Sequence, residues 1–189
     1  MLKYKLLHPE ILSALGAAGH NARVLIADGN FPFSTQLGPN AQLVCLNLSP
    51  GVVTVAQVLD AVATAIPIQG ACVMKPASEG PYAMKNDPPA WDEYRNIFMR
   101  ENVDVDLEEL DIPAFYNAAC GDDVALTIAT ADQGWYANVL LSIGAVKPAR
   151  ASVRLMRYTL VWLGVSLTLR SQARKAILLQ SGDHLGFSG

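Results

Sequence analysis

The sequence has none of the short motifs that mark the common hydrolytic, nucleotide-dependent and metal-dependent enzymes. It contains no GxSxG, no GxGxxG, no Walker loop, no HExxH and no CxxC. Each of these motifs supplies a specific piece of chemistry, such as an exposed nucleophile, a phosphate cradle or a set of zinc ligands. We therefore expect neither a metal ion nor a cofactor, and we disfavour hydrolase and kinase activities.

Charged residues are also few. The 189 residues are 51% hydrophobic and 16% charged, with a net charge of -3. This composition is typical of a globular protein, and it provides no overall positive field that would attract nucleic acid or an anionic membrane. We therefore expect a small-molecule partner, with no nucleic acid and no membrane.

Cysteine is scarce, and its distribution argues against disulfides. Cys45, Cys72 and Cys120 are odd in number, and the first two lie within apolar runs, as free buried thiols do. The segment MLKYKLLHPEIL lacks both the apolar core and the small-residue cleavage site of a signal peptide. These features predict a cytoplasmic protein.

The distribution of charge divides the chain after residue 146. Residues 1–146 hold 7 Lys and Arg against 16 Asp and Glu, whereas residues 147–189 hold 7 against a single acid, Asp183. We predict a domain over 1–146 and a basic, apolar extension over 147–189. The uncharged run at 158–169 is shorter than the roughly 18 to 20 residues that a membrane-spanning helix needs. The extension is either a poorly packed, even aberrantly translated, segment or a basic amphipathic one that docks on the acidic domain or on a membrane surface.

Within residues 1–146, apolar runs that end in turn residues alternate with segments of helical periodicity. Strands are predicted at 23–29, 42–48, 71–74, 124–130 and 138–144, and helices at 9–19, 54–67, around 91–98 and around 113–119. The stretch 75–89, rich in proline and glycine, is predicted to be a loop, and the acidic stretch 101–111 a connection. This alternation indicates a single three-layer α/β/α domain with a mostly parallel or mixed sheet.

His20 is the histidine best placed for chemistry. It follows Gly19 at a predicted helix-to-strand turn, and Asp28 stands at the carboxyl end of that strand, where open α/β sheets bind their ligands. An imidazole can give and take a proton near neutral pH. Both residues also have structural interpretations, because His20 suits a helix C-terminus and Asp28 suits the Asp-Gly-Asn turn.

A second candidate group lies near the end of the domain. In WYANVLLSIG, Tyr136 and Asn138 stand two residues apart and share a side if the segment is extended. The pair suits a sugar, because the amide donates and accepts hydrogen bonds while the aromatic face covers the apolar side of a pyranose. The alternative is that both side chains satisfy local backbone groups at the start of a strand.

The order of these motifs is more specific than any one of them. HPEIL, GH, IADGNFP, a remote FY and the ending ATxxxxWYANVLLSIGAV resemble the L-fucose mutarotase and D-ribose pyranase family over residues 1–146, and NFP is closer to the fucose branch. The resemblance implies that His20 is the proton donor and that Asp28, Tyr136, Ala137 and Asn138 bind the monosaccharide. It also implies a ring-shaped homo-oligomer, commonly a decamer, with each site at a subunit boundary.

One position departs from the family pattern. The family's substrate-contacting Arg or His stands three residues before the phenylalanine that matches Phe115, and this chain has Ile112 there. No Arg, Lys or His occurs between Glu101 and Tyr136, so a shifted alignment does not restore the basic residue.

These residues together favour an isomerase of the mutarotase class, acting on L-fucose or a related sugar. Interconverting anomers, or pyranose and furanose forms, requires one group to take the proton of the anomeric hydroxyl and another to protonate the ring oxygen. The division of roles stays open: His20 serves either oxygen, Asp28 orients His20 or a sugar hydroxyl, and Tyr136 is a candidate second proton carrier. The main rival is a non-catalytic sugar-binding protein or transport accessory.

Overall fold

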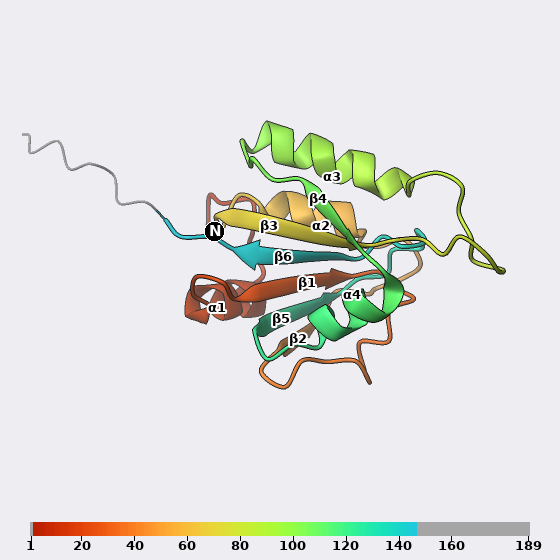
Figure 1. Ribbon diagram of the computed structural model, residues 1–189. Coiled ribbons are helices and arrows are strands. Elements are labelled where there is room, and N and C mark those ends of the chain that lie inside the picture. The colour runs from red at the N-terminus through yellow and green to blue at the C-terminus, as the bar shows by residue number, and fades with distance from the viewer. Residues whose placement is uncertain (1, 147–189) are drawn as a thin grey trace, which may run out of the picture. The chain divides into compact units, whose positions relative to one another are not determined.

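Six strands and four helices are distributed along residues 2–146, the part of the chain that the computed structural model describes (Figure 1). The strands are β1 (Arg23–Ala27), β2 (Gln42–Cys45), β3 (Ile68–Met74), β4 (Leu107–Leu110), β5 (Val124–Ala129) and β6 (Val139–Ile143). The helices are α1 (Pro9–Ala17), α2 (Val55–Val62), α3 (Pro89–Arg100) and α4 (Ile112–Ala119). The predicted extension at 147–189 lies outside the described residues.

The strands form one mixed sheet with the order β2-β5-β1-β6-β3-β4. Neighbouring strands within the group β2, β5 and β1 are parallel, as are β3 and β4, whereas β6 lies between the two groups and is antiparallel to both β1 and β3. In this register Ile26 of β1 pairs with Val139 of β6. The start of β6 therefore lies beside the carboxyl end of β1, which brings Asp28 and the group of Tyr136 and Asn138 to the same end of the sheet.

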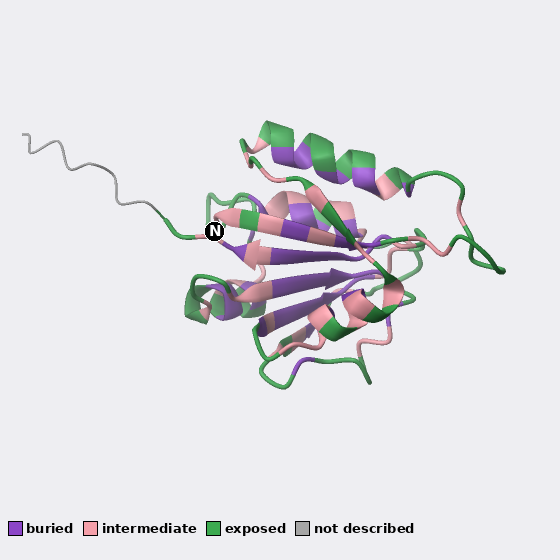
Figure 2. Ribbon diagram, in the orientation of Figure 1, coloured by how far each residue is buried: buried purple, intermediate pink, exposed green. Residues whose placement is uncertain are grey.

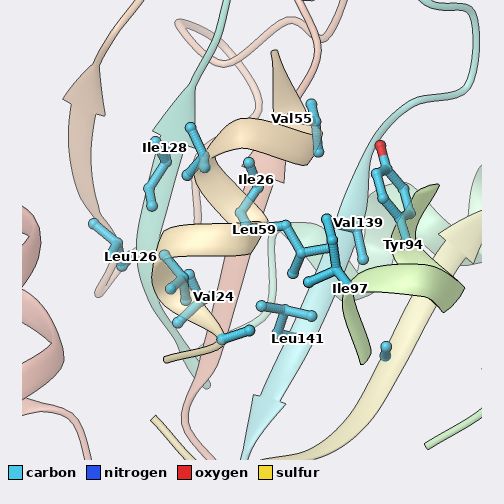
Figure 3. Close-up of a cluster of buried hydrophobic side chains, with 14 of the residues drawn as sticks. Val24, Ile26, Val55, Leu59, Tyr94, Ile97, Leu126, Ile128, Val139 and Leu141 are labelled. Atoms are coloured by element: carbon cyan, nitrogen blue, oxygen red, sulfur yellow. The ribbon is translucent and has the colours of Figure 1, made fainter. Parts of the chain in front are cut away.

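Side chains alternate between two cores, one on each face of the sheet. Val24 and Ile26 of β1 pack with residues of α1, α2 and α3, and Figure 3 shows part of this larger core around Leu59 and Tyr94. Leu25 and Ala27 face the opposite side, where they pack with residues of α4. The central strands β5, β1 and β6 are accordingly the most buried part of the domain (Figure 2). The predicted three-layer α/β/α arrangement is confirmed.

Local side chains set where two of the helices begin. The Thr54 hydroxyl accepts a hydrogen bond from the Gln57 N–H at 3.2 Å, and the Gln57 side chain accepts one from the Thr54 N–H at 3.0 Å, which completes a capping box. At α4 the Asp111 carboxylate accepts from the Ala114 N–H at 2.8 Å. This cap holds Ile112 as the first residue of α4.

One strand was not predicted. The acidic stretch 101–111 contains β4, a short edge strand that pairs with β3. Its Glu108 and Glu109 are exposed, so the strand lacks the apolar run that indicates a buried one. Two helices are also shorter than predicted, since α1 ends at Ala17 and α2 at Val62. Among the described residues, no helix has the length and apolar character to cross a membrane.

Candidate active site

A cavity of about 370 Å³ opens at the carboxyl end of β1, beside the core that α4 covers. Its volume lies in the range of small-molecule sites. The lining combines polar and apolar side chains: Asp28, Asn30, Phe31, Met74, Tyr82, Ile112, Tyr116, Trp135, Tyr136 and Asn138. The structure thus brings together three of the five predicted site residues, namely Asp28, Tyr136 and Asn138.

Asp28 and Asn138 form a reciprocal pair although they lie 110 positions apart in the sequence. The Asn138 side-chain NH₂ donates to Asp28 Oδ2 at 2.8 Å, and the Asp28 backbone N–H donates to Asn138 Oδ1 at 2.8 Å. Both residues are almost completely buried, with 2% and 4% of their surface exposed. Asp28 Oδ1 also accepts from the N–H groups of Asn30 at 2.9 Å and Phe31 at 3.0 Å. The carboxylate is therefore fixed in position before any ligand binds.

Burial also changes the acidity of this carboxyl group. Desolvation raises the pKa of Asp28 from 3.8 to about 6, against the opposing effect of the backbone N–H groups of Asn30, Phe31 and Ala137. The negative charge of Asp132 adds a smaller increase to the pKa. A carboxyl group with such a pKa can exchange a proton near neutral pH, which an exposed aspartate does poorly.

Tyr136 joins the cavity to the loop that follows β3. Its hydroxyl accepts a hydrogen bond from the Ala77 N–H at 3.2 Å and donates one to the Tyr82 carbonyl at 2.9 Å. Its backbone lies in the left-handed region with φ 57, which a bulky residue rarely adopts. The Trp91 indole N–H donates to the Tyr136 carbonyl at 3.4 Å. Because the phenol already donates its proton to a carbonyl, the geometry favours a positioning role for Tyr136.

The other two predicted site residues do not line this cavity. Ala137 is fully buried, and its carbonyl accepts a hydrogen bond from the Tyr94 hydroxyl at 2.5 Å. Ala137 thus fixes the backbone between Tyr136 and Asn138 and sends no side chain into the cavity.

His20 lies at the opposite end of β1 from Asp28. The five residues of β1 separate them, and at about 3.3 Å per residue this strand alone spans about 17 Å. The exposed His20 ring has its Nε2 atom 3.0 Å from Gln69 Oε1, and the Gln69 amide donates in turn to Asn21 Oδ1. Nε2 therefore carries the proton, and Nδ1 is left to exchange one. One copy of the chain does not bring His20 to the sugar-sized cavity.

Several cavity residues were missed at the level of sequence. Phe31 and Tyr116 stack with their ring centroids 5.4 Å apart, and Tyr82 meets Trp135 edge to face at 5.8 Å. Phe31 and Tyr116 belong to the NFP and FY motifs, and Met74 ends a predicted strand. These positions could therefore have been predicted from the sequence to lie near the site. Tyr82 lies in a loop, whose path over the cavity no local pattern reveals.

Within residues 2–146, the lining contains no Lys, Arg or His, and Ile112 is part of it. Among the described residues that line the cavity, Asp28 is therefore the only one whose side chain carries a formal charge at neutral pH. Elsewhere in residues 2–146, no group of three or more His, Cys, Asp or Glu side chains is arranged to hold a metal ion.

Comparison with known proteins finds relatives in sequence and in fold. The mouse (Mus musculus) fucose mutarotase is 27% identical over 149 residues, which cover 75% of this chain and 92% of the mouse protein. The crystal structure of FucU from Bifidobacterium longum is 29% identical with a TM-score of 0.61, covering 74% of this chain and 95% of that one. The fucose mutarotase of Streptococcus pneumoniae in complex with L-fucose is 20% identical, and it supports the fold with a TM-score of 0.65 over 78% of this chain and all of that one.

A family model also matches most of the chain. The model of the RbsD / FucU transport protein family matches residues 1–146, which is the whole of the domain described above. The chain therefore belongs to the RbsD / FucU transport protein family.

Proposed function

We propose that this protein is a monosaccharide mutarotase that acts on fucose or a closely related sugar. The observation that carries the proposal is the buried Asp28 carboxyl group, held by Asn138 in a cavity of about 370 Å³ that has aromatic side chains in its lining. Relatives named fucose mutarotase, and a solved relative that contains L-fucose, support the choice of sugar. The activity is that of an isomerase and needs no cofactor.

In this proposal Asp28 is one of the two proton carriers of ring opening. Its carboxylate takes the proton of the anomeric hydroxyl while a second group protonates the ring oxygen, and the two proton transfers reverse on closure. Asn138 and the N–H groups of Asn30 and Phe31 keep the carboxylate in a single orientation. Positioned acid and base groups of this kind typically contribute about 10² to 10⁴ in rate.

The second proton carrier in this proposal is His20 of another copy of the chain. His20 is exposed and held by Gln69 with Nδ1 available, but it lies at the other end of β1 from the cavity. A head-to-tail contact between copies would bring the His20 end of one to the Asp28 end of the next, and repetition of that contact closes a ring. The proposal therefore includes a ring-shaped homo-oligomer, for which a decamer is the family expectation.

We also propose a cytoplasmic location. Cys45, Cys72 and Cys120 are free thiols in the structure, which suits a reducing compartment.

NMR saturation transfer between the anomers of L-fucose tests the catalytic proposal. The wild-type protein should accelerate exchange, and His20→Ala and Asp28→Asn should each abolish the acceleration. Asp104→Asn, which removes an exposed carboxylate from the connection between α3 and β4, is the matched control and should keep full activity. Saturable binding of the sugar without acceleration would instead support the non-catalytic, sugar-binding rival.

Mixing two inactive variants tests the shared site. Co-expressed His20→Ala and Asp28→Asn chains each contribute the residue that the other lacks, so random head-to-tail assembly should restore about a quarter of the sites. No recovery in a mixed oligomer, shown to contain both chains by mass spectrometry, would place both groups of a working site in one copy and refute the shared arrangement.

A further inference from the structure

A second cavity, of about 500 Å³, lies at the carboxyl ends of three strands. Its lining comes from the segments that follow β1, β2 and β5, which are adjacent and parallel in the sheet. Open α/β sheets bind ligands beyond the carboxyl ends of their strands, and this volume lies in the range of small-molecule sites. The second cavity therefore has the position and the size of a binding site, although the proposed proton transfers make no use of it.

The second cavity adjoins the candidate active site, because Asn30 and Trp135 line both of them. Consecutive residues of the loop after β1 divide between the two: Asp28 lines the candidate active site, and Gly29 lines the second cavity. The Trp135 side chain is 50% exposed, and its ring meets that of Tyr82 edge to face. A molecule that extends from Asp28 past Trp135 therefore enters the second cavity.

The side chains of the second cavity suit hydroxyl groups. Asn47 and Gln133 are exposed, and their amides both donate and accept hydrogen bonds. The Asp132 carboxylate accepts from the N–H groups of Val55 and Gly134, each at 2.9 Å, and each of its oxygens keeps a further lone pair for a ligand. The second cavity can therefore bind several hydroxyl groups at once.

The charge of the second cavity disfavours an anionic ligand. Among the described residues that line it, none is Lys, Arg or His, and Asp132 contributes a negative charge. A phosphate or carboxylate group bound there would lie near this charge without a positive partner. A neutral sugar ring fits better, because its hydroxyls can pair with the polar side chains while its apolar face covers the exposed ring of Trp135.

We propose that the second cavity binds a neutral sugar unit that is joined by a glycosidic bond to the sugar in the candidate active site. The substrates are then reducing disaccharides as well as monosaccharides. The reducing-end ring presents its free anomeric hydroxyl to Asp28, and the second ring lies on Trp135 among Asn47, Gln133 and Asp132. Ring opening moves a proton from the anomeric hydroxyl to the ring oxygen and breaks only the bond between this oxygen and C1, so the glycosidic bond stays intact. This inference rests on the proposed mutarotase function and extends the substrate class of the same site.

Anomer exchange of disaccharides that have L-fucose at the reducing end and a neutral hexose on O2, O3 or O4 tests the proposal, with free L-fucose as the reference. Contacts of the second ring should lower KM about tenfold for at least one linkage at unchanged kcat, because they are the same before and during ring opening. A uronic acid in place of the hexose should lose this gain, because its carboxylate would lie near Asp132.

The outcomes separate the inference from the function on which it rests. If no neutral disaccharide has a lower KM than L-fucose, the inference is overturned and the mutarotase proposal stands. An equal gain for the uronic acid would overturn the assignment of the second ring to this cavity. No acceleration of any sugar, L-fucose included, would refute the mutarotase proposal and the inference with it.

Two variants assign the gain to the second cavity. Asn47→Ala and Gln133→Ala each remove an amide that lines the second cavity but not the candidate active site. Each should raise KM for the favoured disaccharide about fivefold and leave kcat and KM for L-fucose unchanged. Asn96→Ala, at an exposed position of α3, is the matched control and should change the kinetics of neither substrate. An undiminished gain in both variants, or an equal rise in KM for L-fucose, would overturn the assignment; if one variant fails to fold, the other decides.

Discussion

Replacing Asp28 with asparagine should remove a specific pH dependence from the stability of the domain. In the folded protein the pKa of Asp28 is about 6, against an ordinary value of 3.8. Between these two pH values the folded protein binds more protons than the unfolded chain, so stability falls as the pH rises through this window. At about 1.36 kcal/mol per pKa unit, a shift of about 2 units weakens the wild-type fold by about 3 kcal/mol above pH 6, relative to pH 3.8 and below. The asparagine variant has no such titration.

Urea unfolding of both proteins from pH 4 to pH 8, at one protein concentration, measures the effect. The unfolding free energy of the variant also differs from that of the wild type by an amount that does not depend on pH. This is because the amide that Asp28→Asn introduces cannot accept all of the hydrogen bonds that the carboxylate receives from Asn138 and the backbone. The informative quantity is therefore the change with pH of the difference in unfolding free energy. That difference should move in favour of the variant by about 3 kcal/mol, mostly between pH 4 and pH 6.

Asp104→Asn serves as the matched control, because it makes the same substitution at an exposed position outside the cavity. Parallel curves for Asp28→Asn and wild type would show that burial does not disfavour the ionised Asp28. A difference that moved in favour of the wild type as the pH rose would show a lowered pKa, and with it the loss of the argument for Asp28 as a proton carrier near neutral pH.

Three further changes test other parts of the structure. Asn138→Ala removes the amide that donates to Asp28 Oδ2, so the pKa of Asp28 should rise beyond about 6. In a plot of the anomer exchange rate against pH, the fall in rate on the acid side should therefore move to higher pH. An unchanged pH for this fall would show that Asn138 does not affect the acidity of Asp28. Tyr136→Phe removes the hydrogen bonds to Ala77 and Tyr82, each worth about 1 kcal/mol, so amide hydrogen exchange in residues 76–88 should accelerate and KM should rise more than kcat falls. A fall in kcat of about 100-fold at constant KM would instead identify Tyr136 as a proton carrier. A chain that ends at Val146 should keep its activity and its unfolding free energy within about 0.5 kcal/mol, as measured by saturation transfer and urea unfolding; aggregation or loss of folding would assign a structural role to 147–189.

The buried elements could be predicted from sequence because their patterns are local. The apolar runs of β1 and β5 and the periodicity of α2 mark those elements within a few residues of their observed ends. β4 could not be found in this way, because an edge strand with exposed Glu108 and Glu109 needs little apolar sequence. Its partner β3, buried within the sheet, supplies the pairing that holds it.

The candidate site shows the same limit at the level of single residues. Asp28 and Asn138 could each be singled out from their motifs, but their hydrogen-bonded pairing depends on the position of β6 in the sheet, which no local pattern encodes. His20 and Asp28 are only eight positions apart in the sequence, yet an extended strand holds them at opposite ends of the sheet. Proximity along the chain was therefore a poor guide to proximity in space.

The position of β6 also has a consequence for how the protein is made. Of the strands in residues 2–146, β6 leaves the ribosome last, and it joins the two parallel parts of the sheet, so a nascent chain without β6 cannot complete either core. Contacts this distant along the chain form late and slowly in folding. The same strand brings Asn138 to Asp28. A growing chain therefore cannot complete the candidate sugar site before the six-stranded sheet is whole, and the appearance of sugar binding would mark the moment when this sheet is complete.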